Sequence, residues 1–172
     1  MGAPVPTITQ SYRGFVNSET PSVRSPQPTC STTATSVSAL GSYPSKCAGA
    51  ADSNYVISYT GRTVNLTYSI PELFRETSSK NSGSTVTIMV QLKNYSGTNL
   101  SSPNITVTVT GFAPSPAPGV PRTGNFTFMP TGNSGANYQY NLKTTTYPKG
   151  TYTLTWTATG DPIPHTLLVL LN

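Results

Sequence analysis

The sequence predicts an all-β protein: an immunoglobulin-like antiparallel β-sandwich preceded by an extended, disulfide-pinned N-terminal segment. Three observations predict this fold. Apolar and polar residues alternate through residues 137–171, similar short runs recur from residue 54 onward, and glycine and proline separate the runs. A period of two places one set of side chains on a buried face and the other in water, as in a packed antiparallel sheet.

The N-terminal third of the chain differs from the rest. Residues 1–53 contain six prolines, many small polar residues and only short apolar pieces. Proline removes a backbone donor and is confined to sheet edges and loops. We therefore expect an extended arm over residues 1–53, with one edge strand near residues 8–16, and a sandwich domain over residues 54–172.

The two cysteines, Cys30 and Cys47, lie within this arm. The surrounding residues offer no histidine and no further cysteine, so they lack the ligands of a zinc site. A disulfide closing a loop of roughly 15 residues is the favoured interpretation, and it would add about 3 kcal/mol by the loop-entropy model. Two unrelated free thiols are the alternative. A disulfide implies an oxidising compartment, hence a secreted or cell-surface protein.

From residue 54 onward, predicted strands follow one another with no helix of ordinary length. Pro71 suits the first position of a single helical turn over residues 71–76. A proline-rich loop occupies residues 114–121. About eight strands at intervals of roughly 8 to 15 residues match the immunoglobulin-like pattern. The strands predicted before the last three cover residues 55–59, 63–70, 84–93, 104–111 and 125–129.

The last three strands supply the predicted core. Tyr140 alternates with polar residues in the first of them, and Tyr152, Leu154 and Trp156 alternate with threonines in the second. We expect these four residues to anchor the core. The final strand, 167–171, is apolar on both phases, which a half-exposed edge would not tolerate. It is expected either to be buried under the arm of the same chain or to take part in strand exchange.

Residues 82–93 (SGSTVTIMVQLK), followed by a turn and a Thr/Val strand, resemble the opening of bacterial extracellular Ig-like modules of the PxKF type, or a looser relative of them. The runs 138–144 (YQYNLKT), 150–154 (GTYTL) and 165–169 (HTLLV) resemble the closing strands of that family. The resemblance covers about residues 80–172, but TIMV at 87–90 stands where the naming motif would lie. It implies a non-catalytic module of secreted or surface-anchored proteins.

Charge and hydropathy exclude two classes of partner. The ten basic and five acidic residues give a net charge of +5, but the basic residues are spread singly along the chain. Nucleic-acid binding needs them gathered into a stripe, so no nucleic acid is expected. No apolar run approaches the ~20 residues of a membrane helix, so no membrane insertion is expected. The expected partners are proteins (neighbouring domains or copies of the chain) or surface glycans.

Asparagine sequons mark the candidate glycosylation sites. Three of them fall on the polar phase of predicted strands, and the other two fall in a turn, so all five are expected to be exposed. The five asparagines are Asn65, Asn94, Asn99, Asn104 and Asn125.

Residues that could carry chemistry are few. His165, the one histidine, begins the last strand and is expected to bond to backbone or water rather than to serve catalysis. Asp161 belongs to a Gly-Asp-Pro turn, where aspartate bonds its own backbone. The acids are scattered singly and form no expected metal or catalytic site: Glu19, Asp52, Glu72, Glu76 and Asp161. No cofactor is predicted.

We therefore expect a non-catalytic structural or interaction module that serves as a spacer, in adhesion or in display. One alternative is a subunit of an extracellular filament assembled by strand exchange, with the N-terminal arm as the donor. Another is a carbohydrate-binding accessory domain, which would present exposed tyrosines. The candidates for such tyrosines are Tyr12, Tyr43, Tyr95 and Tyr147.

Overall fold

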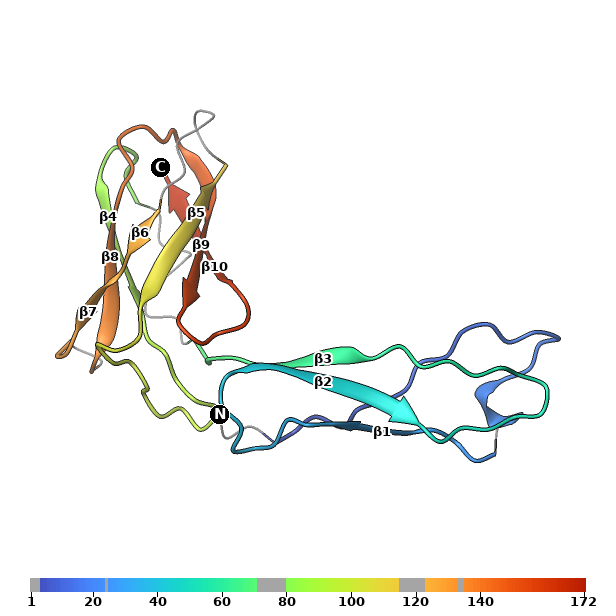
Figure 1. Cartoon of the computed structure of the whole chain (residues 1–172). Coiled ribbons are helices and arrows are strands. Elements are labelled where there is room, and N and C mark those ends of the chain that lie inside the picture. The colour runs from blue at the N-terminus through green and yellow to red at the C-terminus, as the bar shows by residue number, and fades with distance from the viewer. Residues whose placement is uncertain (1–3, 24, 71–79, 115–122, 133–134) are drawn as a thin grey trace.

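The computed structural model is all-β with antiparallel sheets, which confirms the predicted class. It describes residues 4–23, 25–70, 80–114, 123–132 and 135–172. The predicted helical turn at 71–76 and most of the proline-rich loop at 114–121 lie outside these residues. An elongated finger, residues 4–66, projects from a sandwich, residues 80–172 (Figure 1). No helix among the described residues is long and apolar enough to cross a bilayer.

The finger is built on a three-stranded sheet of order β1-β2-β3. Its strands are β1 (Thr29–Thr32), β2 (Gly41–Ala48) and β3 (Arg62–Leu66). Cys30 lies directly opposite Cys47 in the β1–β2 register, so the predicted disulfide joins neighbouring strands. β2 runs outward from the sandwich and β3 returns to it (Figure 1).

Three predicted elements differ from the structure. Residues 8–16 and 55–59 form no strand, although both segments run along the finger (Figure 1). The strand predicted at 63–70 is shorter and pairs with β2 of the finger, where we had expected it in the sandwich. Alternation of apolar and polar residues indicates that one face of a strand is buried, but it does not indicate which strand pairs with it. This is why the pairing partner of residues 63–70 was predicted wrongly. The division of the chain at residue 53 stays a prediction.

The sandwich has a four-stranded sheet of order β10-β9-β5-β6 facing a three-stranded sheet of order β4-β8-β7. The chain passes between the sheets at Phe126, which separates β6 from β7 and is buried. The strand bounds are β4 Thr85–Val90, β5 Val107–Ala113, β6 Gly124–Asn125, β7 Thr127–Met129, β8 Asn137–Lys143, β9 Gly150–Ala158 and β10 His165–Leu171.

The order of these strands is consistent with an immunoglobulin-like sandwich. A further feature of that fold is a tyrosine near the start of a central strand whose hydroxyl bonds back to the preceding corner. Tyr152 fits this description, because its hydroxyl donates to the carbonyl of Pro148 at 2.8 Å. The ring of Tyr152 stacks on Phe112 and meets Tyr147 edge-on. Tyr147, which we expected to be exposed, is therefore buried at this corner.

The hydrophobic core belongs to the sandwich. All members of the buried cluster follow residue 67 in the chain, and Leu40 is the finger residue that packs against it. Trp156, Leu154 and Tyr152 lie inside the core, and Tyr140 is partly buried at its margin. The two-residue alternation of β9 thus places its apolar phase between the sheets.

The final strand buries every second side chain, although residues 167–171 are all apolar. Leu167, Val169 and Leu171 are buried, whereas Leu168 is 47% exposed. Near its end, β10 is joined in parallel by Lys80, whose N–H donates to the carbonyl of Leu170 at 2.9 Å. We expected this strand either to be buried under the N-terminal arm or to take part in strand exchange. Burial under the arm is wrong for the described residues, because the arm lies in the finger (Figure 1). Strand exchange stays a prediction.

Two buried tyrosines should make the protein sensitive to alkali. Burial raises the pKa of both Tyr68 and Tyr138 above the usual 10.0. The hydroxyl of Tyr138 also donates to the carbonyl of Ser102 at 2.9 Å, a bond that the phenolate cannot make. A raised folded-state pKa gives stability that is present below pH 10 and is lost as pH rises through the folded value.

We therefore expect the free energy of unfolding, measured in urea, to fall steeply above about pH 10. The double variant Tyr68→Phe/Tyr138→Phe should be less stable at pH 7 but should show a flatter alkaline slope. Tyr95→Phe, at a tyrosine that is 66% exposed, is the control and should keep the wild-type slope. An unchanged slope in the double variant would contradict this account.

Candidate functional site

A groove of about 770 Å³ lies along the finger. One wall is the N-terminal segment, residues 6–15, and the other is formed by residues 55–60 together with β3. Ser45 and Cys47 of β2 also line it. The N-terminal segment runs from the sandwich end of the finger to its far end (Figure 1). There Asn17 and Ser18, both with positive φ, turn the chain back, and the N–H of Glu19 donates to the carbonyl of Val16.

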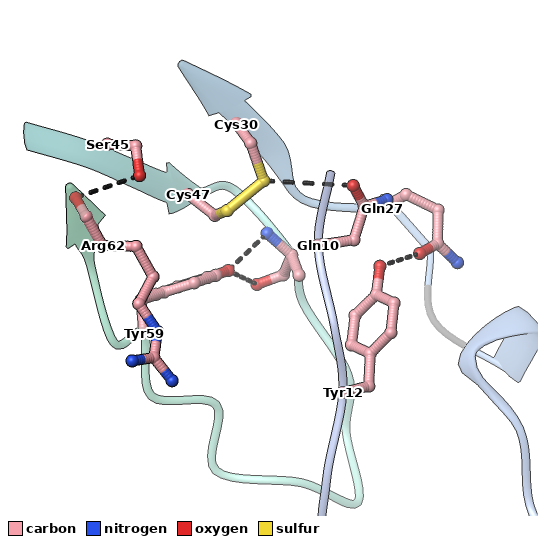
Figure 2. Close-up of a disulfide and its surroundings, with 9 residues drawn as sticks. Gln10, Tyr12, Gln27, Cys30, Ser45, Cys47, Tyr59 and Arg62 are labelled. Carbon is pink, nitrogen blue, oxygen red and sulfur yellow. Dashed lines mark hydrogen bonds between the residues drawn. A yellow bond between two sulfur atoms is a disulfide. The ribbon is translucent and has the colours of Figure 1, made fainter. Parts of the chain in front are cut away.

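The Cys30–Cys47 disulfide holds the sheet that supports this groove. The Oε1 atom of Gln10 lies 3.9 Å from the sulfur of Cys30, and the hydroxyl of Tyr12 donates to Gln27 at 3.0 Å. Figure 2 shows the segment that carries Gln10 and Tyr12 passing beside the disulfide. The Tyr12 hydrogen bond thus attaches the segment to the chain just before β1.

Aromatic residues join the two walls toward the far end. The ring of Phe15 lies 6.2 Å from that of Tyr12 and 5.8 Å from that of Tyr55. The hydroxyl of Tyr55 donates to Glu19 at 2.5 Å and accepts the N–H of Val16 at 3.2 Å. The hydrogen bond to the Glu19 carboxylate raises the pKa of Tyr55. These contacts join the two walls toward the far end of the finger.

The charged residues that line the groove are all basic: Arg13, Lys46 and Arg62. Arg62 stands opposite Ser45 in the β2–β3 register and shares its face, whereas Lys46 follows Ser45 and projects from the other face. Among the described residues, no carboxylate lies within ion-pair distance of Arg13 or Arg62. The groove therefore favours anionic groups.

A second polar cluster joins the finger to the sandwich. The carboxylate of Asp161 is fully buried, and it accepts the N–H of Tyr68 at 3.1 Å and that of Ile163 at 3.3 Å. The Nε2 atom of His165 lies 2.8 Å from Asp161 Oδ2. Tyr68 follows β3, so this carboxylate binds the exit of the finger to the β9–β10 turn. The predicted bonds of Asp161 to its own turn are present.

The prediction for His165 was wrong, because the imidazole bonds to a carboxylate rather than to backbone or water. Its ring also stacks on Trp156, with centroids 4.7 Å apart and planes at 29°. Trp156 is 1% exposed, so the pair does not open onto a cleft at the indole. The indole Nε1 has no hydrogen-bond partner among the described residues. The cluster acts as a buried structural link.

The other predicted site residues are dispersed. Asn65, Asn104 and Asn125 are exposed, whereas Asn94 and Asn99 are partly buried. The side-chain amide of Asn99 donates to the carbonyl of Ala136 at 2.8 Å, so a glycan there would replace an internal bond. Whether any of the five carries a glycan stays a prediction. Tyr12 lines the groove, Tyr43 bonds Ala39, and Tyr95 is exposed on a sandwich turn.

No group of three or more metal-ligating side chains occurs within the described parts of the chain. Sequence reasoning did not find the groove, because its walls are extended segments without periodic strands. The available signal was the recurrence of aromatic residues at Tyr12, Phe15, Tyr55 and Tyr59.

Comparison with known families gives one match. Residues 1–67 are similar to the family described as MBG domain (YGX type). Modules of this type are β-rich and non-enzymatic and occur in extracellular proteins. The match covers the finger, whereas the resemblance to PxKF-type modules concerns the sandwich and stays a prediction. No curated protein and no solved structure matches the chain significantly.

We expect Asp161→Asn to lower the free energy of unfolding by about 1.5–3 kcal/mol, the usual range for hydrogen bonds to a charged group. The asparagine amide keeps one acceptor oxygen, but it loses the negative charge that strengthens the hydrogen bonds with Tyr68, Ile163 and His165. Urea unfolding followed by Trp156 fluorescence measures this. Asp52→Asn is the control: Asp52 caps a turn through the N–H of Asn54 at 2.8 Å, and its loss should cost under about 1 kcal/mol. Equal effects would contradict a linking role for Asp161.

Proposed function

We propose that the chain is an adhesion module of a secreted or cell-surface protein, in which the sandwich holds the finger out as the binding element. The observation that carries this proposal is the groove on the finger. Its volume falls within the range of about 300–1,000 Å³ that is typical of ligand sites. The family match over residues 1–67 supports a non-catalytic extracellular module for the same part of the chain.

The division of the molecule supports the same proposal. The sandwich contains the packed core, so it forms a rigid base. The finger carries exposed apolar side chains near its far end, since Val16 is 58% and Val56 103% exposed. Exposed apolar groups beside a groove are typical of contact surfaces. A spacer alone would need neither feature.

Two tryptophan substitutions test the role of the groove. Thr9→Trp/Ser58→Trp places one indole on each wall, and Thr85→Trp/Thr166→Trp is the control on exposed sandwich positions. Beads coated with each protein are passed over immobilised extracellular-matrix proteins and glycans. We expect wild-type and control beads to be retained on at least one surface, and retention to fall about tenfold for the groove variant.

Two results would overturn the proposal. Absence of retention of wild-type beads on every surface would remove the adhesion role. Equal retention of the groove variant would show that another face makes the contact. Near-UV circular dichroism of each variant checks that the sandwich remains folded.

A further inference from the structure

Parts of the two walls share an unusual property: residues 7–11 and 56–60 belong to no strand. Among the described residues, no backbone N–H or C=O of residues 7–11 or 56–60 forms a hydrogen bond. The ladder of the neighbouring sheet ends at β3. The structure therefore holds two extended segments on either side of a gap, without joining them by a ladder.

Unpaired extended backbone is a template for strand addition. A peptide in the groove would satisfy N–H and C=O groups on the walls, and backbone bonds give affinity without requiring one sequence. The walls are held by the hydrogen bond from Tyr12 to Gln27 and, toward the far end of the finger, by the contact between the rings of Phe15 and Tyr55. The walls are thus partly ordered before a peptide binds, which lowers the conformational entropy lost on binding.

The basic residues that line the groove favour an acidic peptide. Arg13 and Arg62 line it, no carboxylate does, and neither arginine has an acidic partner among the described residues. Glu19 follows the N-terminal wall in the chain, but its carboxylate accepts the hydroxyl of Tyr55. Acidic side chains that alternate along an extended peptide would meet the two guanidinium groups.

The aromatic residues favour a peptide over a glycan. A glycan platform needs exposed rings in a planar strip. Here the rings of Phe15 and Tyr55 meet edge-on at 73°, and those of Tyr12 and Phe15 are tilted by 55°. Such rings make pockets for individual side chains rather than a flat surface.

We propose that the groove between residues 6–15 and 55–60 binds an extended acidic peptide of a partner protein by β-strand addition. This inference rests on the proposed adhesion role and names its ligand. The peptide forms backbone hydrogen bonds with the walls, and its carboxylates pair with Arg13 and Arg62.

The test uses a fluorescein-labelled peptide of about eight residues, since the wall from residue 7 to 13 spans about 23 Å at ~3.3 Å per residue. Glutamate and threonine alternate in it. One comparison peptide replaces glutamate by lysine. Another keeps the glutamates but carries N-methyl groups on alternate amides, which removes backbone donors at constant charge. Anisotropy of the intact oxidised protein should give about tenfold weaker binding for each comparison peptide.

Two double variants test the arginines at equal net charge. Arg13→Glu/Arg62→Glu should weaken binding of the glutamate peptide about tenfold, whereas Lys143→Glu/Lys149→Glu, on exposed sandwich residues, should leave it unchanged. Circular dichroism checks the fold of both.

Four results would overturn the inference. They are equal binding of the N-methylated peptide, equal weakening by the two double variants, tighter binding of oligogalacturonate than of the glutamate peptide, and dimers of the chain that the groove variant Thr9→Trp/Ser58→Trp no longer forms. The last would assign the groove to a second copy. Bead retention that depends on the groove, together with failure of the peptide, would leave the adhesion role standing and reject only the ligand.

Discussion

The finger depends on one covalent constraint, the Cys30–Cys47 disulfide. Among the described residues, every member of the buried hydrophobic cluster follows residue 67, so the described part of the finger has no comparable core of its own. A short three-stranded sheet without a packed face is marginal in water. Because Cys30 faces Cys47 across β1 and β2, the bridge restricts the unfolded finger and holds the strands that support the groove. Groove geometry is therefore linked to the oxidising conditions that the cysteines imply.

The sandwich has the opposite character. Its stability comes from apolar side chains between two sheets, and Trp156 and the Tyr152 corner lie at the centre of this packing. Asp161 connects the two parts, because one buried carboxylate accepts the N–H of Tyr68 after the finger and bonds His165 at the start of β10. A buried charge is tolerated where several donors surround it. The finger is thus carried by a base that contains the packed core, and Asp161 and Leu40 join the two parts.

Sequence reasoning recovered the elements whose cause is local. The apolar phase of β9 identified Trp156, Leu154 and Tyr152, and two cysteines without other ligands identified the bridge. It did not recover pairings between distant segments. Residues 62–66 pair with β2 rather than with the sandwich, and His165 bonds Asp161 rather than backbone. The groove was missed for a related reason. It forms because residues 6–15 and 55–60 lie opposite each other, and no pattern within either segment indicates that.

The central claim is that the finger and the sandwich are held by different forces, a covalent bridge in one and a hydrophobic core in the other. Amide hydrogen exchange of the native protein, measured with and without a reductant, tests this most directly. We expect reduction to remove protection from Thr29–Thr32, Gly41–Ala48 and Arg62–Leu66 while Gly150–Ala158 stays protected. Loss of protection in both parts together, or full protection of the reduced finger, would contradict it.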